Sequence, residues 1–290
     1  MSLSLGGTPT ATTNAAQISY DQNVKLAYQG ASQLRPRVQV KAGVVGASHD
    51  FRTFGKGVAT QHSSAELITP QDYQHSKVSC TLSNWRIGEY TDLFDQCEST
   101  VDERALLAES NGKAIGRRED QLVIDALDAA TSIAGTVDED LGGTDSGINP
   151  TKLRRARRYL VAKGAGGGDL TLAVNAIGQE TALANTEVTS ADYQTMRALV
   201  DADLDKKYAF GFKWCVFEDR AEGGLPLGST SIRLCFAFDK MAVGLAVGME
   251  PQSRVDFIPE RASWLSQSMQ KAGSVVIDAN GVVEVQSYEA

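Results

Sequence analysis

The stretch that decides the fold is residues 100–134, TVDERALLAESNGKAIGRREDQLVIDALDAATSIA, which has the pattern of one long helix. Thr100 and Glu103 match a capping box, in which each side chain accepts a hydrogen bond from the backbone amide of the other residue. Apolar residues recur at helical spacing from Ala105 onward, and Gly135 is the expected C′ residue. At ~1.5 Å per residue the helix is roughly 50 Å long, more than a compact domain usually covers. We therefore expect other segments, those of other subunits included, to pack on it.

Composition limits the classes of partner. The chain has 290 residues, of which 42% are hydrophobic and 22% charged, as in ordinary globular proteins. A net charge of -8 argues against nucleic acid or an anionic membrane as the main partner. No apolar run reaches the ~20 residues of a membrane-spanning helix, and no signal-peptide pattern is present. These features predict a protein made and kept in the cytoplasm. The cysteines are far apart and are expected to be buried free thiols: Cys80, Cys97, Cys215 and Cys235.

The region before the long helix contains two strand patterns separated by a long excursion. Residues 34–41 and 77–83 alternate between apolar and polar side chains, as half-buried strands do. The intervening residues are rich in glycine and poor in apolar side chains, which favours a functional loop over a packed element. We therefore predict that residues 37–82 form a two-stranded loop that extends from the body. The small, polar residues 1–17 are expected to form an N-terminal arm held by a neighbouring subunit.

The region after the long helix begins with a second helix at residues 150–163. Asn149 is its predicted N-cap, Pro150 its first residue, and Gly164 its end. The helix carries Lys152, Arg154, Arg155, Arg157, Arg158 and Lys163. Two interpretations stay open, a surface for nucleic acid or an acidic partner, or a solvated face with local salt bridges.

The remaining segments alternate between short helices and strands. We predict helices at residues 176–184 and 191–202, strands at 170–174, 209–217 and 231–238, and a buried helix or strand at 239–248. Residues 274–278 and 282–286 flank Asn280-Gly281, the strongest short signal for a hairpin. The C-terminus is therefore expected to form a paired strand at a sheet edge.

No motif of a known catalytic or cofactor site is present. The chain lacks a nucleophile elbow, a zinc-protease helix motif, a Walker lysine and a dinucleotide fingerprint. His49, His62 and His75 all fall in the predicted loop at spacings that fit no metal site, and we interpret them as solvated. Residues 138–140 are interpreted as an acidic loop without the calcium-binding pattern. We predict no catalytic residue, cofactor or metal, although catalysis by paired carboxylates stays open.

The order of elements, from arm and projecting loop through a long helix to a mixed α/β region and terminal strands, resembles the HK97-like major capsid protein of tailed bacteriophages. Several segments also resemble one branch of that family: residues 32–35 before 38–40, Gly116–Asp120 before 124–127, 189–193, 210–212, and 273–278 before 281–283. The resemblance implies an α+β fold with an N-terminal arm at 1–35 and an E-loop at 36–84. It implies a P-domain at 85–144 and 250–290, and an A-domain at 145–249.

The resemblance also implies a function and partners. Copies of the chain would form pentamers and hexamers that close into an icosahedral shell around double-stranded DNA. The virion would be the final location, after assembly in the host cytoplasm. A separate scaffolding protein is expected because no room for a scaffolding segment precedes the arm, and a portal and a decoration protein are further partners. The alternatives are an encapsulin-like compartment of the same fold and a soluble enzyme that uses carboxylates.

The residues expected at subunit contacts are charged. The cluster on the long helix is predicted to pair within or between subunits, against the alternative that water solvates it. The full set of expected contact residues is Arg35, Arg37, Lys56, Arg117, Arg118, Glu119, Asp120, Arg154 and Arg158.

Overall fold

The computed structural model describes residues 32–64, 67, 70–93, 103–184, 208–219, 222–229 and 231–289. The helices are α3 (Glu103–Asp128), α4 (Pro150–Ala162) and α5 (Ala176–Ala184), with single 3-10 turns at η1 (Arg35–Arg37), η4 (Lys240–Ala242), η5 (Pro259–Arg261) and η6 (Ala279–Gly281). The strands are β1 (Gln39–Ala42), β2 (Ser48–Phe54), β3 (His75–Thr81), β4 (Ser83–Asp92), β5 (Gly135–Val137), β6 (Leu170–Asn175), β7 (Tyr208–Ala209), β8 (Phe212–Phe217), β9 (Leu227–Ser229), β10 (Ile232–Asp239), β11 (Val243–Ile258), β12 (Ser263–Val276) and β13 (Val282–Tyr288). Among these residues no helix is long and apolar enough to cross a membrane.

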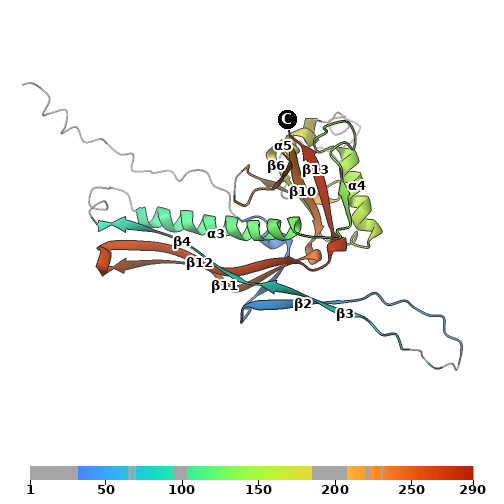
Figure 1. The fold of residues 1–290 in the computed structure, drawn as a ribbon, viewed down its shortest axis with the longest axis horizontal. Helices are drawn as coiled ribbons and strands as arrows, with labels where there is room; N and C mark the ends of the chain where they lie inside the picture. Colours follow the sequence, from blue (N-terminus) through green and yellow to red (C-terminus); the bar gives the residue numbers. More distant parts are fainter. Residues whose placement is uncertain are drawn as a thin grey trace, which may run out of the picture.

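Three parts make up the fold. The spine consists of α3 and a four-stranded sheet in the order β1-β11-β12-β4, along which α3 lies lengthwise (Figure 1). The head, at one end of α3, consists of a sheet in the order β5-β13-β10-β6-β8-β7 together with α4 and α5. The projection is the β2–β3 pair with the described connecting residues 55–64, 67 and 70–74, and it extends away from the body (Figure 1). This mixture of helices and sheets confirms the α+β class.

The long helix exists but is shorter than predicted. It ends at Asp128, and Gly135 is the first residue of β5 instead of a helix C′ residue. The amide of Ala134 donates to the carbonyl of Val282 at 2.9 Å, so this segment pairs with the C-terminal region. A Cβ at Gly135 would lie 2.7 Å from the ring of Tyr159, which explains why a glycine occurs there. The predicted cap at residues 100–102 lies outside the described residues.

The face of the spine sheet beneath α3 is unusually polar. Ser266, Ser268 and Gln270 of β12 are all buried there, and the side-chain amide of Asn111 donates to the Ser266 carbonyl at 3.2 Å. Toward the head, the buried residues of α3 become apolar and join the main core. That core also contains the largest buried aromatic side chains: Phe212, Trp214, Phe217, Phe236 and Phe238. The end of α3 near the head is therefore the apolar anchor of the helix.

The predicted C-terminal hairpin is wrong. β12 pairs with β11 and β4, whereas β13 lies between β10 and β5 in the other sheet. The Asn280-Gly281 pair lies in η6, where the Asp278 carboxylate accepts a hydrogen bond from the Asn280 amide at 2.9 Å. This local cap makes the chain cross from one sheet to the other instead of folding back. β13 is consequently an inner strand of the head and not a sheet edge.

Two crossings between the sheets lie side by side. The chain passes from β10 through η4 into β11, and later from β12 through η6 into β13. The amide of Ile277 donates to the carbonyl of Ala242 at 2.7 Å, and a Cβ at Gly281 would lie 2.5 Å from the Ala242 Cβ. Head and spine are thus joined at a close contact that requires glycine at position 281.

The projection is two-stranded as predicted, but its strands differ. β2 pairs with β3 in antiparallel register from Ser48 opposite Thr81 to Phe54 opposite His75. The predicted strand at 34–41 is instead η1 followed by β1, which pairs in parallel with β11. The rigid φ angle of Pro36 favours the turn and interrupts the strand. A small cluster of Phe51, Cys80, Leu82 and Ala246 holds the base of the projection on the spine sheet.

The other predicted elements of the head are largely confirmed. α4, α5 and β6 agree with prediction, and Asn149 caps α4 by accepting from the Lys152 amide at 2.8 Å. The predicted strand at 209–217 is divided into β7 and β8 by a turn with positive φ at Phe210 and Gly211. The segment 239–248 forms η4 and the start of β11. The predicted helix at 191–202 lies outside the described residues.

Candidate functional site

Residues 32–38, here called the strap, are held on α3 by one buried carboxylate. Asp120, which is fully buried, accepts hydrogen bonds from the Ser32 hydroxyl at 2.9 Å and from the backbone amides of Gln33 at 2.9 Å and Leu34 at 3.0 Å. A Cβ at Gly116, one turn earlier, would lie only 3.1 Å from the Ser32 nitrogen. The Gly116–Asp120 segment is therefore the docking site for the strap.

A second carboxylate on the same turn pairs with the strap. Nη1 of Arg35 lies 3.3 Å from Oε1 of Glu119, and Nη2 lies 2.6 Å from Oε2 of Glu250 on β11. Glu119 is 2% exposed, so burial raises the pKa of its carboxyl, and the Arg35 guanidinium offsets part of that rise. Arg35 thereby connects the strap to both the helix and the sheet of the spine.

Arg118 and Gln121, on either side of these two carboxylates, connect α3 to a loop of the head. The guanidinium of Arg118 lies 3.7 Å from the centre of the Trp85 ring and 3.8 Å from the carboxylate of Glu222. Three residues later, the side-chain oxygen of Gln121 accepts a hydrogen bond from the Gly223 amide at 2.6 Å. Arg117 is half-buried on the same helix. The charged cluster of α3 thus positions the strap on one side and a head loop on the other.

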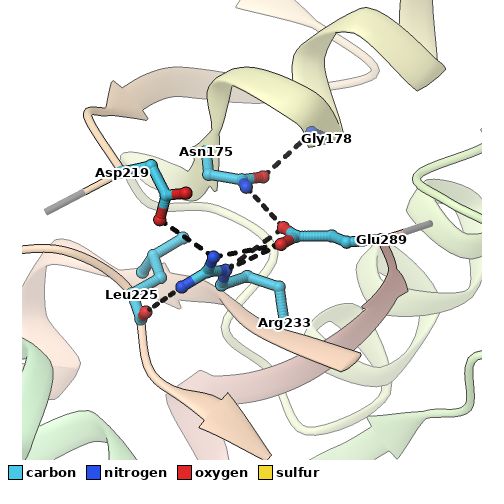
Figure 2. Close-up of polar contacts among 6 residues, drawn as sticks. All are labelled: Asn175, Gly178, Asp219, Leu225, Arg233 and Glu289. Carbon is cyan, nitrogen blue, oxygen red and sulfur yellow. Dashed lines mark hydrogen bonds and ion pairs between the residues drawn. The ribbon is translucent and has the colours of Figure 1, made fainter. Parts of the chain in front are cut away.

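The C-terminal latch is an ionic network in the head, formed by Arg233, Glu289, Asn175 and Asp219 (Figure 2). The side chains of Arg233, Glu289 and Asn175 are buried, whereas that of Asp219 is exposed. Arg233 of β10 contacts the Glu289 carboxylate through Nε at 3.1 Å and Nη2 at 3.0 Å. Its guanidinium also donates to Asp219 at 2.9 Å and to the Leu225 carbonyl at 2.9 Å. Asn175, at the junction of β6 and α5, donates to Glu289 as well. No local pattern of residues predicted this network, because its members are far apart in the chain.

Lys152 of α4 is fully buried, so the interpretation that it lies on a solvated basic face is wrong. Its amine donates to the carbonyls of Ser146 at 2.5 Å and Gln286 at 2.9 Å. Burial lowers its pKa from 10.5 to about 8, although nearby carboxylates such as Glu139 act in the opposite direction. Lys152 therefore holds β13 and the loop before α4 together at the cost of burying a charge.

This burial predicts a pH dependence of stability. Between pH 8 and pH 10.5 the unfolded chain retains a proton on Lys152 that the folded chain has lost, so stability rises with pH in this range. Across the range, wild type should gain about 3 kcal/mol relative to Lys152→Met, as measured by urea unfolding. Lys163→Met, at the exposed end of the same helix, controls for removal of a lysine. A constant difference between wild type and Lys152→Met would contradict this prediction.

The other predicted contact residues lie on separate surfaces. The amine of Lys56, at the base of the connecting loop of the projection, donates to the Lys163 carbonyl at 3.3 Å. Arg154 and Arg158 are exposed on α4. The structure therefore brings Arg35, Glu119 and Asp120 together, with Arg118 nearby, and keeps Lys56 and the α4 arginines apart from them. Whether any of these residues contacts another subunit stays a prediction.

Other groups considered for chemistry have ordinary surroundings. Across the described residues, no group of three or more His, Cys, Asp or Glu side chains could hold a metal ion. His49 and His75 make edge contacts with the rings of Phe51 and Phe54. Three cysteines are confirmed as buried free thiols, namely Cys80, Cys215 and Cys235. Cys97 lies outside the described residues.

Comparison with known proteins decides the family. A family model described as phage capsid protein matches residues 12–289. The chain belongs to this phage capsid protein family. It is a structural protein of the capsid shell, a component of the virion, and not an enzyme. The alternative of a soluble enzyme is therefore wrong.

Solved capsid structures share the fold of this capsid protein. The capsid of the cyanophage P-SCSP1u has a TM-score of 0.73 at 14% identity, with 96% of this chain and 94% of that chain covered. The capsid of Ralstonia phage GP4 has a TM-score of 0.71 at 11% identity, with 100% and 98% covered. The capsid of Helicobacter pylori bacteriophage KHP30 has a TM-score of 0.73 at 9% identity, with 99% of each chain covered. The HK97-like fold is thereby confirmed. No curated protein matches the sequence.

Proposed function

We propose that copies of this capsid protein assemble as hexamers and pentamers into a closed icosahedral shell that encloses double-stranded DNA. The observation that supports the proposal is the exposed apolar surface of the projection. Its connecting residues expose large apolar side chains, with Val58 at 72% and Leu67 at 90% exposure, and Phe54 at the end of β2 is 70% exposed. Such a concentration of exposed apolar surface is typical of an interaction site. A neighbouring subunit that covers it would gain about 25 cal/mol per Å² buried.

A groove on the body offers a surface of matching character. It has a volume of about 590 Å³ and is lined by Val38, Val40 and Met241, with Arg35 and Lys240 at its sides. Met241 is 65% exposed, so the groove is apolar and accessible. We propose that the projection of a neighbouring subunit lies in this groove, because apolar side chains would then be buried on both partners.

The proposed division of the chain into domains follows the family resemblance. Residues 1–35 would act as the N-terminal arm, 36–84 as the E-loop, 85–144 with 250–290 as the P-domain, and 145–249 as the A-domain. One fact refines this division, because β13 belongs to the same sheet as β10, β6 and β8. The proposed contact residues remain Arg35, Arg37, Lys56, Arg117, Arg118, Glu119, Asp120, Arg154 and Arg158. Since Glu119 and Asp120 are buried, they would act by fixing the strap.

Electron microscopy of the purified chain, with and without a co-expressed scaffolding candidate, tests the proposal. Closed shells with hexameric and pentameric units, and nuclease-resistant double-stranded DNA in particles from infected cells, are the expected results. A portal and a decoration protein are the further partners to seek. A chain that stays monomeric under all these conditions would overturn the proposal. Closed shells that contain protein cargo instead of DNA would indicate an encapsulin-like compartment.

Substitutions in the projection should weaken assembly without unfolding the subunit. Val58→Ser combined with Leu67→Ser removes two side chains that are exposed in the subunit, so its melting temperature should not change. If both side chains are buried in the shell, the loss is about 1.5–3 kcal/mol per side chain at every contact. Sedimentation velocity should then detect free subunits in place of shells. Ile177→Ser, which removes an exposed apolar side chain of α5, is the matched control. Full assembly of the double variant would refute a role for these side chains.

A further inference from the structure

The outer face of α4 is strongly basic in a chain that is acidic overall. The helix contains Arg154, Arg155, Arg157 and Arg158 and no acidic residue, whereas the whole chain has a net charge of -8. Its inner face, formed by Lys152, Leu153, Ala156 and Leu160, is buried against the head. Arg157 and Arg158 point away from that face and are exposed. The fold therefore concentrates positive charge on one accessible surface.

Two of these arginines, Arg157 and Arg158, make only contacts with uncharged groups in the part of the chain that the structure describes. Arg157 donates to the Phe210 carbonyl at 3.3 Å, and the guanidinium of Arg158 lies 5.2 Å from the centre of the Tyr159 ring. Hydrogen bonding from Arg155, assisted by the charge of Arg158, lowers the pKa of Tyr159. Neither a carbonyl nor an aromatic ring carries a formal negative charge. Within the described part of the chain, Arg157 and Arg158 form no ion pair with a carboxylate.

The loop before α4 has the opposite character. Residues 138–145 include Asp138, Glu139, Asp140 and Asp145 and no basic residue, and the three aspartates are exposed. The loop is held in one conformation by hydrogen bonds to its backbone. The Ser146 hydroxyl donates to the Glu139 carbonyl at 2.7 Å, and the Asn149 side chain donates to the Leu141 carbonyl at 2.8 Å. Its carboxylates are thus presented to a partner at little cost in conformational entropy.

The two charged surfaces are separated within one subunit. The acidic loop lies before the first turn of α4, whereas Arg157 and Arg158 lie about 10 Å further along the helix at ~1.5 Å per residue. A rigid helix and a fixed loop keep them apart in the same chain. The acidic loop of a second copy is free to approach the outer face of α4. A contact between two unlike surfaces of this kind can repeat around a ring of identical subunits.

We propose that the outer face of α4 docks on the acidic loop, residues 138–145, of a second copy of this chain. The inference rests on the proposed self-assembly and identifies one contact through which the heads of neighbouring subunits recognise each other. A single exposed ion pair stabilises a contact only weakly. The contact would recur at every head-to-head boundary, so these small contributions add up over a ring. They should also weaken as salt screens the charges.

Charge reversal with compensation tests the proposal. Arg157→Glu with Arg158→Glu, and separately Asp138→Lys with Asp140→Lys, should each raise the concentration needed for assembly by roughly tenfold. The combined quadruple variant should recover assembly, because opposite charges face each other again. Arg254→Glu, on an exposed part of β11, controls for net charge. Wild-type behaviour of either double variant, or no recovery in the quadruple variant, would overturn the proposal. If only the arginine double variant weakens assembly, the outer face of α4 binds an anionic partner other than the acidic loop.

A cross-linking experiment separates this contact from closure of the shell. In a Cys97→Ser background, chains carrying both Arg158→Cys and Asp140→Cys should give a ladder of covalent multimers with a short bismaleimide. Chains that carry only one of the two added cysteines should not. The native thiols at Cys80, Cys215 and Cys235 are buried and serve as internal controls. A ladder of multimers without closed shells would support this contact and contradict the proposed closed shell. Closed shells without a ladder would overturn the contact alone.

Discussion

Replacing Arg233 with methionine is expected to lower the free energy of unfolding by about 3–5 kcal/mol, the cost of leaving a buried charge without its partner. The side chains of Arg233 and Glu289 are only 10% and 9% exposed, so water cannot replace the lost guanidinium. The Leu225 carbonyl would lose its donor as well. Urea unfolding of the unassembled chain, followed by circular dichroism, measures the change.

Two variants make this result specific to the C-terminal latch. Arg254→Met removes an exposed arginine of β11 and should leave stability nearly unchanged. Arg233→Met combined with Glu289→Met removes both charges and should recover much of the loss, because no unpaired buried carboxylate remains. If Arg233→Met alone unfolds like wild type, the latch does not stabilise the head.

Asp120→Ala should detach the strap from α3 at a cost of roughly 3 kcal/mol, because buried donors lose their acceptor. The carboxylate accepts from the hydroxyl of Ser32 and from the amides of Gln33 and Leu34. A detached strap should be cut by trypsin after Arg37 at least roughly tenfold faster, since cleavage follows the population of the open state. Mass spectrometry of the timed digest identifies the cut.

The control for this experiment is Asp128→Ala at the exposed last residue of α3. It removes a carboxylate from the same helix without touching the strap, so its digestion should match wild type. Equal trypsin resistance of Asp120→Ala would mean that the Arg35 ion pairs and the burial of Leu34 and Val38 hold the strap without this carboxylate.

Local signals in the sequence predicted local structure well. Asn149 followed by Pro150 places the start of α4 correctly, because capping and the fixed φ angle of proline act within one turn. The run of apolar residues at 170–174 identified the fully buried strand β6. The order of elements along the chain also indicated the correct family, so no single diagnostic motif was needed.

Predictions failed where distant segments decided the outcome. Asn280-Gly281 has the composition of a hairpin turn, yet the side-chain cap from Asp278 and close packing on Ala242 direct the chain into a second sheet. The end of α3 was misplaced because the backbone after Asp128 pairs with residues near the C-terminus. The partners of Ala134, which are Ala279 and Val282, are over a hundred residues away and leave no local pattern.

The candidate site was predicted only in part. The density of charge at Gly116–Asp120 predicted that these side chains pair within or between subunits, but it did not predict the contact of this segment with the strap. Helical spacing places Lys152 on the inner face, since it lies one helical turn before Ala156 and two before Leu160. The basic composition of the helix obscured this pattern. Arg233 and Glu289, in contrast, are 56 residues apart and meet only through the pairing of β10 and β13.

The place of β13 within the head sheet determines how the subunit bears mechanical load. A pull along the spine reaches the head through the crossings at η4 and η6, and part of it is directed along β13. Phe238 and Val282 are paired at the end of the head from which both crossings leave, so such a pull acts on β10 and β13 together. It shears the antiparallel ladder between β10 and β6, because hydrogen bonds run perpendicular to antiparallel strands. An edge hairpin pulled from its open end would lose its bonds one pair at a time. Pressure from inside a shell would therefore be resisted by many bonds acting together in every subunit.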